Sequence, residues 1–280
     1  MRYALIRFLN ARPLWWGLTH RPGQDDQLRF TSPALCADLV ADGAVDLGLI
    51  PAIELARIPD VVAVPSICIG SRTEVRSVLL VSRVPFEEIR SVALDPSSRT
   101  SVALTRILLA EKLGEETYRT IRFDPSERGR LLALEGHDAA VVIGDPALQI
   151  SRDPGPSIRF RYDLVSEWNA LFGDPFVFAL WAGRRDSLER FLAEEVHERL
   201  LASRAFGISQ EEVIAREASE ELALPYEELL DYFRSALHYE FGEDERRALA
   251  RFYDLAAKYA LIEGRKEIEW LFDPKKSQTS

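Results

Sequence analysis

Basic residues are in short supply in this chain of 280 residues, which has 35 lysines and arginines against 45 aspartates and glutamates. The resulting net charge of -10 argues against nucleic acid or an anionic membrane surface as a partner, because both need a basic face. Long apolar runs are missing as well, and no stretch approaches the roughly 18 consecutive apolar residues of a membrane span. We therefore expect no nucleic-acid partner and no membrane partner.

Cysteine and histidine are also scarce. The two cysteines, Cys36 and Cys68, have neither metal-site spacing nor the number for a disulfide framework, which favours a reducing cytoplasm. The four histidines lie outside the predicted strand-end loops, so we expect neither a histidine base nor a zinc site. We also expect no export signal, because Arg7, Asn10 and Arg12 interrupt the apolar N-terminal segment. A cytoplasmic protein without a metal is predicted.

Short apolar strands alternate with helical segments over the first half of the chain, as is typical of an α/β fold. The first series predicts strands at 3–9, 28–31, 45–50 and 61–69, with helices at 14–18, 34–41 and 52–57. The second predicts strands at 91–94, 118–122 and 139–143, with helices at 102–113 and 127–134. Two segments, Leu35–Pro51 and Arg130–Pro146, share the order helix, glycine, aspartate, buried strand and proline. Two similar lobes are therefore expected.

Two apolar segments connect the predicted lobes. Residues 61–69 and 75–81 predict strands joined by a polar turn, either as a hairpin or as the first crossing between the lobes. Phe176–Ala182 is too apolar for an exposed linker and is predicted to return through the core to the first lobe. We assign residues 1–82 and 184–280 to lobe one and 83–183 to lobe two, with helices at 188–203, 210–222, 226–237 and 243–259. This is the plan of an α/β, two-lobed type II periplasmic-binding-protein-like fold with a helical C-terminal segment.

Polar residues at the carboxyl ends of the strands form the candidate site, because ligands of open α/β sheets bind there. They are Asn10 after the first strand, Ser71 and Arg72 at the first crossing, Ser77 on the strand that follows, Thr100 and Ser101 at a helix start, and Asp145 after the last strand of lobe two. An arginine fork matches a carboxylate, and the N–H groups of a helix start attract an anion. Asn10 equally suits a plain turn, and the residues at the two helix starts equally suit capping.

Five segments, in order, resemble one known family. They are FLN with the following PL (Phe8–Leu14), GAVDLGLIPAIELAR (Gly43–Arg57), SICIGS followed by VRSVLL (Ser66–Leu80), SRTSVALTRILL (Ser98–Leu109) and PFVFALW (Pro175–Trp181). The set is similar to chorismate dehydratase, an enzyme family of menaquinone biosynthesis by the futalosine route. The resemblance covers most of the first 182 residues and implies a cytoplasmic enzyme with the two-lobed fold and no cofactor. The chain departs from the family at Arg7, Phe8 and Thr73, where Ser, Tyr and Gly are expected.

The resemblance implies loss of water from chorismate to give 3-[(1-carboxyvinyl)oxy]benzoate. The ring C4 hydroxyl and a C3 hydrogen leave, and aromatisation drives the step. The protein then mainly has to hold two carboxylates, orient the hydroxyl and exclude water. Ser71 with Arg72 is predicted to bind one carboxylate. Thr100 with Ser101 is predicted to bind the other.

Two residues are the catalytic candidates in this assignment. Asn10 is predicted to hydrogen-bond the departing hydroxyl, because a neutral amide can do so without adding charge. Asp145 is predicted to orient the hydroxyl or to transfer a proton. Ser77 is predicted to line the cleft. Glu54 is a weaker acid–base candidate, because a solvated helical glutamate is far commoner than a catalytic one.

Other functions use the same fold. A cytoplasmic small-anion-binding protein would keep the cleft without turnover, and a related dihydroxynaphthoate synthase-type lyase would rely on a cleft histidine that this chain lacks. A transporter's solute-binding subunit would need an export signal or lipid anchor, and an effector-binding regulator would need a basic helix-turn-helix, which is not visible. A group of aromatic residues can wall a pocket but better suits core packing or a dimer surface, which leaves a homodimer open; they are Trp15, Trp16, Trp168, Phe172 and Phe176.

Overall fold

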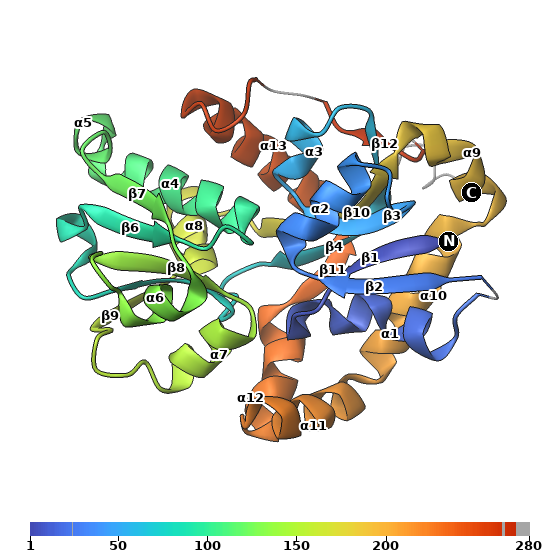
Figure 1. Cartoon of the computed structure of the whole chain (residues 1–280), viewed down its shortest axis with the longest axis horizontal. Coiled ribbons are helices and arrows are strands. Elements are labelled where there is room, and N and C mark those ends of the chain that lie inside the picture. Colours follow the sequence, from blue (N-terminus) through green and yellow to red (C-terminus); the bar gives the residue numbers. More distant parts are fainter. Residues whose placement is uncertain (24, 265–266, 273–280) are drawn as a thin grey trace.

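The computed structural model describes residues 1–23, 25–264 and 267–272, and Figure 1 shows two lobes side by side, each built on a sheet flanked by helices. Within those residues the first lobe holds a seven-stranded sheet in the order β11-β4-β10-β3-β1-β2, with β12 beside β4. The strands are β1 (Arg2–Ile6), β2 (Gln27–Thr31), β3 (Leu47–Pro51), β4 (Val61–Ser71), β10 (Phe176–Arg184), β11 (His238–Phe241) and β12 (Glu269–Trp270). β1 is parallel to β2 and β3, whereas β10 is antiparallel to β3 and β4.

The second lobe holds a sheet whose described strands follow the order β7-β6-β8-β5-β9. They are β5 (Val78–Ser82), β6 (Ser91–Leu94), β7 (Arg122–Pro125), β8 (Ala139–Ile143) and β9 (Phe160–Asp163). β6 is parallel to β7 and β8, and β5 is antiparallel to β8 and β9. β8 has the sequence AAVVI and is buried at every position, as expected of a central strand covered on both faces.

The two sheets share one topology, which confirms the expectation of two similar lobes. The run β2-β1-β3-β10-β4 corresponds to β7-β6-β8-β5-β9 in both order and strand direction. In each lobe a helix precedes the third strand of this run, and a glycine lies between the two. Gly43 and Gly136 have φ values of 67° and 70°, which a residue without a β-carbon adopts at no steric cost. Each glycine therefore lets the chain leave its helix and turn into the strand.

Helices flank both sheets (Figure 1). In the first lobe they are the 3-10 helix η1 (Leu9–Ala11), α1 (Arg12–His20), α2 (Pro33–Ala41), α3 (Glu54–Arg57), η3 (Arg185–Ser187), α9 (Leu188–Ala193), α10 (Val196–Ser209), α11 (Glu211–Leu222), α12 (Tyr226–Asp231), the π-helix η4 (Tyr232–Ala236) and α13 (Glu243–Lys258). In the second they are η2 (Phe86–Glu88), α4 (Arg99–Leu113), α5 (Glu115–Tyr118), α6 (Arg128–Ala133), α7 (Asp145–Arg152) and α8 (Leu164–Phe172). α2 begins one residue before the predicted helix at 34–41, and its N-cap Ser32 accepts a hydrogen bond at Oγ from Leu35 N at 3.3 Å.

The lobe boundaries differ from the predicted ones. β5 was predicted within lobe one but pairs with β8 and β9 of the second sheet, so β4 and β5 are not a hairpin. β10 confirms the predicted return to the first lobe, but all of it belongs to that lobe's sheet, although the predicted boundary lay at residue 183. The first crossing is therefore residues 72–77, and the second lies between α8 and β10. Both strands are uniformly apolar, and apolarity alone does not show which sheet a strand joins.

Two strands differ from the expectations. β11 was not predicted: His238–Phe241 lies between the predicted helices at 226–237 and 243–259 and forms a strand on the edge of the first sheet beside β4. The strand predicted at 118–122 begins only at Arg122, whereas Tyr118 is the last residue of α5. In both places the local sequence fits either state, and pairing with a distant strand decides.

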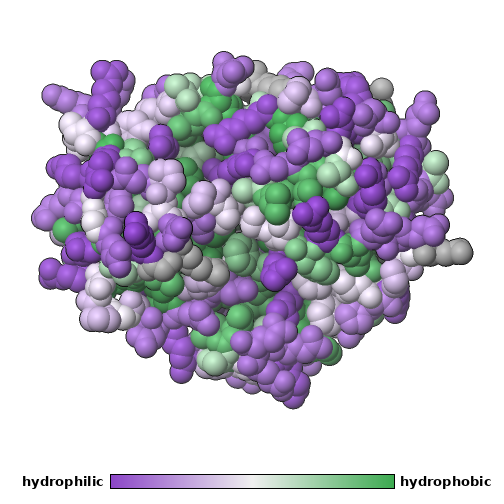
Figure 2. All heavy atoms as spheres, in the orientation of Figure 1, coloured by the Kyte–Doolittle hydropathy of each residue, from purple (hydrophilic) through white to green (hydrophobic). Residues whose placement is uncertain are grey.

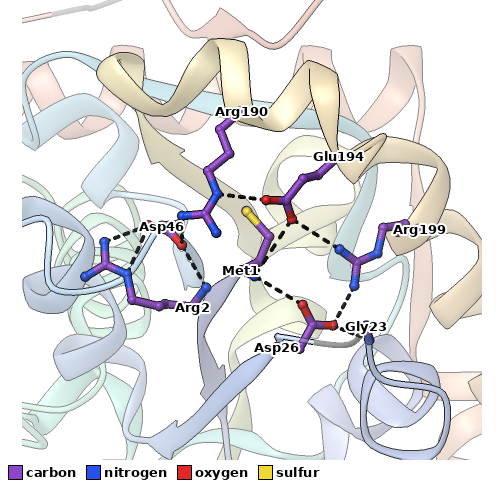
Figure 3. Close-up of polar contacts among 8 residues, drawn as sticks. All are labelled: Met1, Arg2, Gly23, Asp26, Asp46, Arg190, Glu194 and Arg199. Carbon is purple, nitrogen blue, oxygen red and sulfur yellow. Dashed lines mark hydrogen bonds and ion pairs between the residues drawn. The ribbon is translucent and has the colours of Figure 1, made fainter.

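Figure 3 shows how α9 and α10 are fastened to the N-terminal part of the first lobe. The buried carboxylate of Asp46 accepts hydrogen bonds from Arg2 N at 2.8 Å and from Arg190 Nη1 at 2.9 Å. Asp26 accepts one from Arg199 Nη2 at 2.5 Å. Burial works against ionisation, but these donors and charges hold the pKa of both carboxyls below the usual value. α9 and α10 are thereby part of lobe one.

On the face drawn in Figure 2, hydrophilic side chains cover most of the surface. Apolar side chains reach this surface in separate patches among the hydrophilic ones. The aromatic residues noted in the sequence pack inside. Trp168 is fully buried, with its ring centroid 5.3 Å from that of Phe176 and 6.4 Å from that of Phe252. Core packing is therefore the role of this cluster. The predicted homodimer stays a prediction.

Candidate functional site

A pocket lies between the two lobes, at the carboxyl ends of β1, β3 and β8. We call it the interlobe pocket. It contains about 440 Å³ of space between atoms, a figure that includes its open mouth. Its lining is Ile6, Phe8, Asn10, Pro33, Pro51, Ile69, Val78, Ser98, Arg99, Thr100, Ser101, Ile143, Gly144, Phe178 and Ala179. The pocket therefore has apolar walls, with polar groups contributed mainly by Asn10 and residues 98–101.

Asn10 lies in η1, directly after β1. Its Oδ1 atom is buried and has no hydrogen-bond partner among the described residues. Its main-chain carbonyl is held, because Tyr239 Oη donates to Asn10 O at 3.0 Å. A buried acceptor without a partner costs free energy unless a ligand or water supplies a donor. The Asn10 side chain is therefore ready to receive a hydrogen bond from a bound molecule.

The N-terminus of α4 forms the opposite wall of the interlobe pocket. Ser98, Thr100 and Ser101 are all buried. Thr100 Oγ1 accepts a hydrogen bond from Ile53 N of the first lobe at 3.3 Å, and the Ser98 side chain makes no capping bond to its helix. The first N–H groups of an α-helix have no partner within the helix and carry its positive dipole end. This wall can hold an anion with neutral donors.

Arg99 is the one charged residue in the described lining, and its charge is already matched. It forms ion pairs of 2.8 Å with Asp38 and 3.0 Å with Glu54, both in the first lobe. Burial acts to lower the pKa of Arg99, but the two acids together raise it above the usual value. Glu54 is buried outside the pocket and also pairs with Arg57 at 2.9 Å. Arg99 therefore fastens lobe two to lobe one, and Glu54 is a structural counter-ion.

Three predicted binding residues lie outside the lining. Ser71 Oγ donates to the Glu74 carbonyl at 2.6 Å within the first crossing. Ser77 Oγ accepts a hydrogen bond from Tyr232 Oη at 2.7 Å. Arg72 is largely exposed and lines a separate surface pocket beside η4. Their role in substrate binding stays a prediction, and the structure shows that two of the hydroxyls stabilise the crossing.

Asp145 begins α7, next to the lining residue Gly144. Its Oδ1 atom accepts a hydrogen bond from Leu9 N of the first lobe at 2.9 Å. The predicted catalytic pair of Asn10 and Asp145 is thus brought together from two lobes, with the aspartate bonded to the residue before the asparagine. Leu9 and Asp145 are 136 residues apart in the sequence, so the sequence alone could not show this contact.

Sequence reasoning missed four lining residues of consequence. Phe8, Ser98 and Phe178 were noted only within segments that resemble the family, and no role in the site was assigned to them. Gly144 was noted only within the segment Arg130–Pro146. Gly144 offered one signal, because a glycine directly after a buried strand often marks a close approach.

Histidines do not contribute to the interlobe pocket. His238 lies with its Nε2 atom 3.0 Å from Glu245 Oε1, on the side of the first sheet that faces α13. Over residues 1–23, 25–264 and 267–272 there is no group of three or more His, Cys, Asp or Glu side chains arranged to hold a metal ion. None of the described helices has the length and apolarity to cross a membrane.

Comparison with known proteins decides the family. The model of a family described as menaquinone biosynthesis matches residues 1–258. The chain belongs to this menaquinone-biosynthesis family. A chorismate dehydratase of Thermus thermophilus is 26% identical over 263 residues, which cover 89% of this chain and 92% of that relative. The family resemblance read from the five sequence segments is confirmed.

Solved structures similar to this family member show its fold. A protein of Archaeoglobus fulgidus matches with a TM-score of 0.73 at 18% identity, over 93% of this chain and 98% of that one. The periplasmic aliphatic sulphonate binding protein SsuA of Escherichia coli matches with a TM-score of 0.64 at 16% identity, over 96% and 89%. At such identities the likeness concerns the fold alone. The predicted periplasmic-binding-protein-like fold is confirmed.

Proposed function

We propose that the protein is a hydro-lyase that removes water from chorismate to give 3-[(1-carboxyvinyl)oxy]benzoate. The family and the relative named chorismate dehydratase support this substrate. The observation in the site that carries the proposal is the buried, unpartnered Asn10 Oδ1 in a pocket with no free charge. An elimination driven by aromatisation needs orientation and a dry site more than it needs acid–base machinery.

One of the two substrate carboxylates fits a neutral set of donors. Ser98, Thr100 and Ser101 at the start of α4 line the interlobe pocket, and the dipole of this helix favours an anion there. We assign one carboxylate to this wall. The apolar walls, including Phe8 and Phe178, fit the ring and the enolpyruvyl group.

The reaction breaks the C3–H and C4–O bonds. The C–H electron pair becomes part of the aromatic ring, and the hydroxyl leaves with the proton as water. We assign Asn10 to the hydroxyl, which its amide can orient by hydrogen bonding without changing protonation state. The described lining has no Asp, Glu or His to accept the C3 proton. A carboxylate of the substrate itself therefore serves as the base in this proposal.

Contacts between the lobes would keep water from this step. Thr100 bonds to Ile53 N, and Arg99 pairs with Asp38 and Glu54, all across the lobe boundary. These contacts surround the same helix start that would hold the carboxylate. Binding of substrate and closure of the lobes would thus support one another.

The test is direct. Purified protein is mixed with chorismate, and the reaction is followed by ultraviolet absorbance and by mass spectrometry. We expect the loss of one water and the spectrum of a substituted benzoate. Saturable binding of chorismate with no loss of water would overturn the dehydratase proposal. That outcome would support the alternative, a small-anion-binding protein, which the SsuA-like fold also permits.

A further inference from the structure

The turn between β8 and α7 of the second lobe docks on the turn between β1 and η1 of the first. Asp145 Oδ1 accepts the Leu9 N–H at 2.9 Å. One residue earlier, Gly144 lies against the Phe8 ring so closely that a β-carbon at Gly144 would stand 2.5 Å from Cδ1 of the ring. Phe8, Asn10 and Gly144 all line the interlobe pocket, so this docked pair of turns is part of its wall.

The hydrogen bond from Leu9 acts on the helix that carries Asn10. Leu9 is the first residue of η1, and Phe8, the residue before it, makes no side-chain capping bond. An N–H at a helix start needs a partner from outside the helix. Here the partner is a carboxylate from the other lobe. The other main-chain anchor, from Tyr239 Oη to Asn10 O at 3.0 Å, comes from β11 in the same lobe as Asn10.

We propose that Asp145 is a positioning residue, which sets the Asn10 amide only when the lobes close. The kinetic tests of this inference rest on the proposed dehydration of chorismate. When the lobes separate, the Leu9 N–H loses its carboxylate, whereas the Tyr239 anchor remains because it lies within one lobe. Asn10 therefore reaches its working geometry on closure, when water is also excluded. This role requires an acceptor oxygen at Asp145 and no proton transfer.

Two substitutions separate positioning from proton transfer. Asp145→Asn keeps an acceptor oxygen at the same distance, and we expect it to retain most of kcat with an unchanged pH profile. Asp145→Ala removes the acceptor, and we expect kcat to fall about a hundredfold, the loss typical of a small misplacement of a reacting group, with a smaller change in KM. Asp244→Ala is the control, because it removes an exposed acid from the first turn of α13, remote from the pocket.

Two kinetic results would overturn the proposal. One is an Asp145→Asn variant as inactive as Asp145→Ala, or with a shifted pH profile, which would assign proton transfer to the carboxylate. The other is an Asp145→Ala variant with wild-type kcat. Circular dichroism and thermal melting check the fold of each variant first. If Asp145→Ala does not fold, Asp145→Ser replaces it, because a serine keeps a polar group at the start of α7 but is too short to reach Leu9 N.

Hydrogen exchange tests the hydrogen bond from Leu9 N to Asp145 Oδ1 without any turnover. Exchange at the Leu9 amide, followed by mass spectrometry of peptides that span residues 8–11, should become about tenfold faster in Asp145→Ala, which corresponds to loss of one protecting hydrogen bond. It should stay at the wild-type rate in Asp145→Asn and Asp244→Ala. Unchanged exchange in Asp145→Ala would overturn the inference even in an active enzyme. If the wild-type protein does not dehydrate chorismate, the proposed function is wrong. The hydrogen-exchange test remains valid, because it does not depend on turnover.

Discussion

The ring of Phe8 occupies the space into which a side chain at Gly144 would project, with Cδ1 2.5 Å from the position of a β-carbon. Phe8 belongs to the first lobe and Gly144 to the second. Gly144 has φ 68° and ψ -147°, a region open almost only to glycine. The close contact with the Phe8 ring and the backbone conformation of Gly144 together require glycine at this point of the lobe boundary.

Gly144→Ala should impair closure as well as stability. We expect the free energy of unfolding to fall by about 1 to 3 kcal/mol from backbone strain. Because the new methyl group also pushes the Phe8 ring away, kcat/KM for chorismate should fall by about tenfold or more. Urea unfolding and steady-state kinetics measure the two effects.

Gly155→Ala is the matched control for that substitution. Gly155 has φ 69° in the same lobe, but an added β-carbon there meets no atom within 4 Å. In Gly155→Ala the free energy of unfolding should fall because of backbone strain, and kcat/KM should stay at the wild-type value. A Gly144→Ala enzyme with unimpaired kcat/KM would show that the close contact with Phe8 is not needed for turnover.

Asn10→Ala should damage catalysis far more than folding. Asn10 Oδ1 has no protein partner among the described residues, so its removal should change the free energy of unfolding by less than about 1 kcal/mol. Loss of a positioned hydrogen-bonding group in a dry site should lower kcat by about a hundredfold or more. Parallel kinetics and urea unfolding check this.

Asn169→Ala is the control for Asn10. Asn169 Nδ2 donates to the Arg72 carbonyl at 3.0 Å, and the residue does not line the interlobe pocket. This variant should lose stability while keeping most of kcat. If Asn10→Ala instead loses stability and turnover in equal measure, Asn10 is a turn residue and the catalytic assignment fails.

Glu245 should contribute to the stability of the protein at neutral pH and lose that contribution in acid. Burial acts to raise its pKa, but His238 and the N–H of Gly242, which donates at 2.9 Å, lower the pKa to about 2. The ordinary value of 4.5 applies to the unfolded chain. A depressed pKa stabilises the folded state above pH 4.5, and this stabilisation, about 3 kcal/mol, is lost as the pH falls through about 2.

Urea unfolding of wild type and Glu245→Gln over a pH series measures this contribution, and the difference between the two removes the parallel titration of Asp26 and Asp46. We expect the variant to be less stable at neutral pH and the difference to shrink in acid. Glu243→Gln, an exposed acid in the same helical turn, should show no such trend. A difference between wild type and Glu245→Gln that is the same at every pH would contradict the prediction.

Some elements followed from local sequence because a local cause governs them. β8 was predicted correctly and α2 to within one residue, since continuous apolarity and a capping side chain act within a few residues. β11 was missed because its HYEF sequence becomes a strand only by pairing with β4. The assignment of β5 and β10 to the wrong lobes has the same cause, since a strand's partners lie far away in the chain.

The candidate site divides in the same way. Asn10, Thr100 and Ser101 could be found from the sequence, because strand ends and helix starts have recognisable residues and the fold puts them at one edge. Arg72 matched the same pattern but lies outside the interlobe pocket. The direction of a side chain at a crossing depends on how the two lobes are joined, and the sequence does not encode that locally.

The sequence by itself determined the α/β class, the two similar lobes, the place of the cleft and the family, because these depend on periodic apolarity, capping and ordered motifs. Only the tertiary structure decided which strand belongs to which lobe, that Arg99 is matched by Asp38 and Glu54, and that Asp145 reaches Leu9. Those relationships join residues far apart in the chain. These contacts form only when the two lobes pack against each other. Groups then interact because they are close in space, whatever their separation in the sequence.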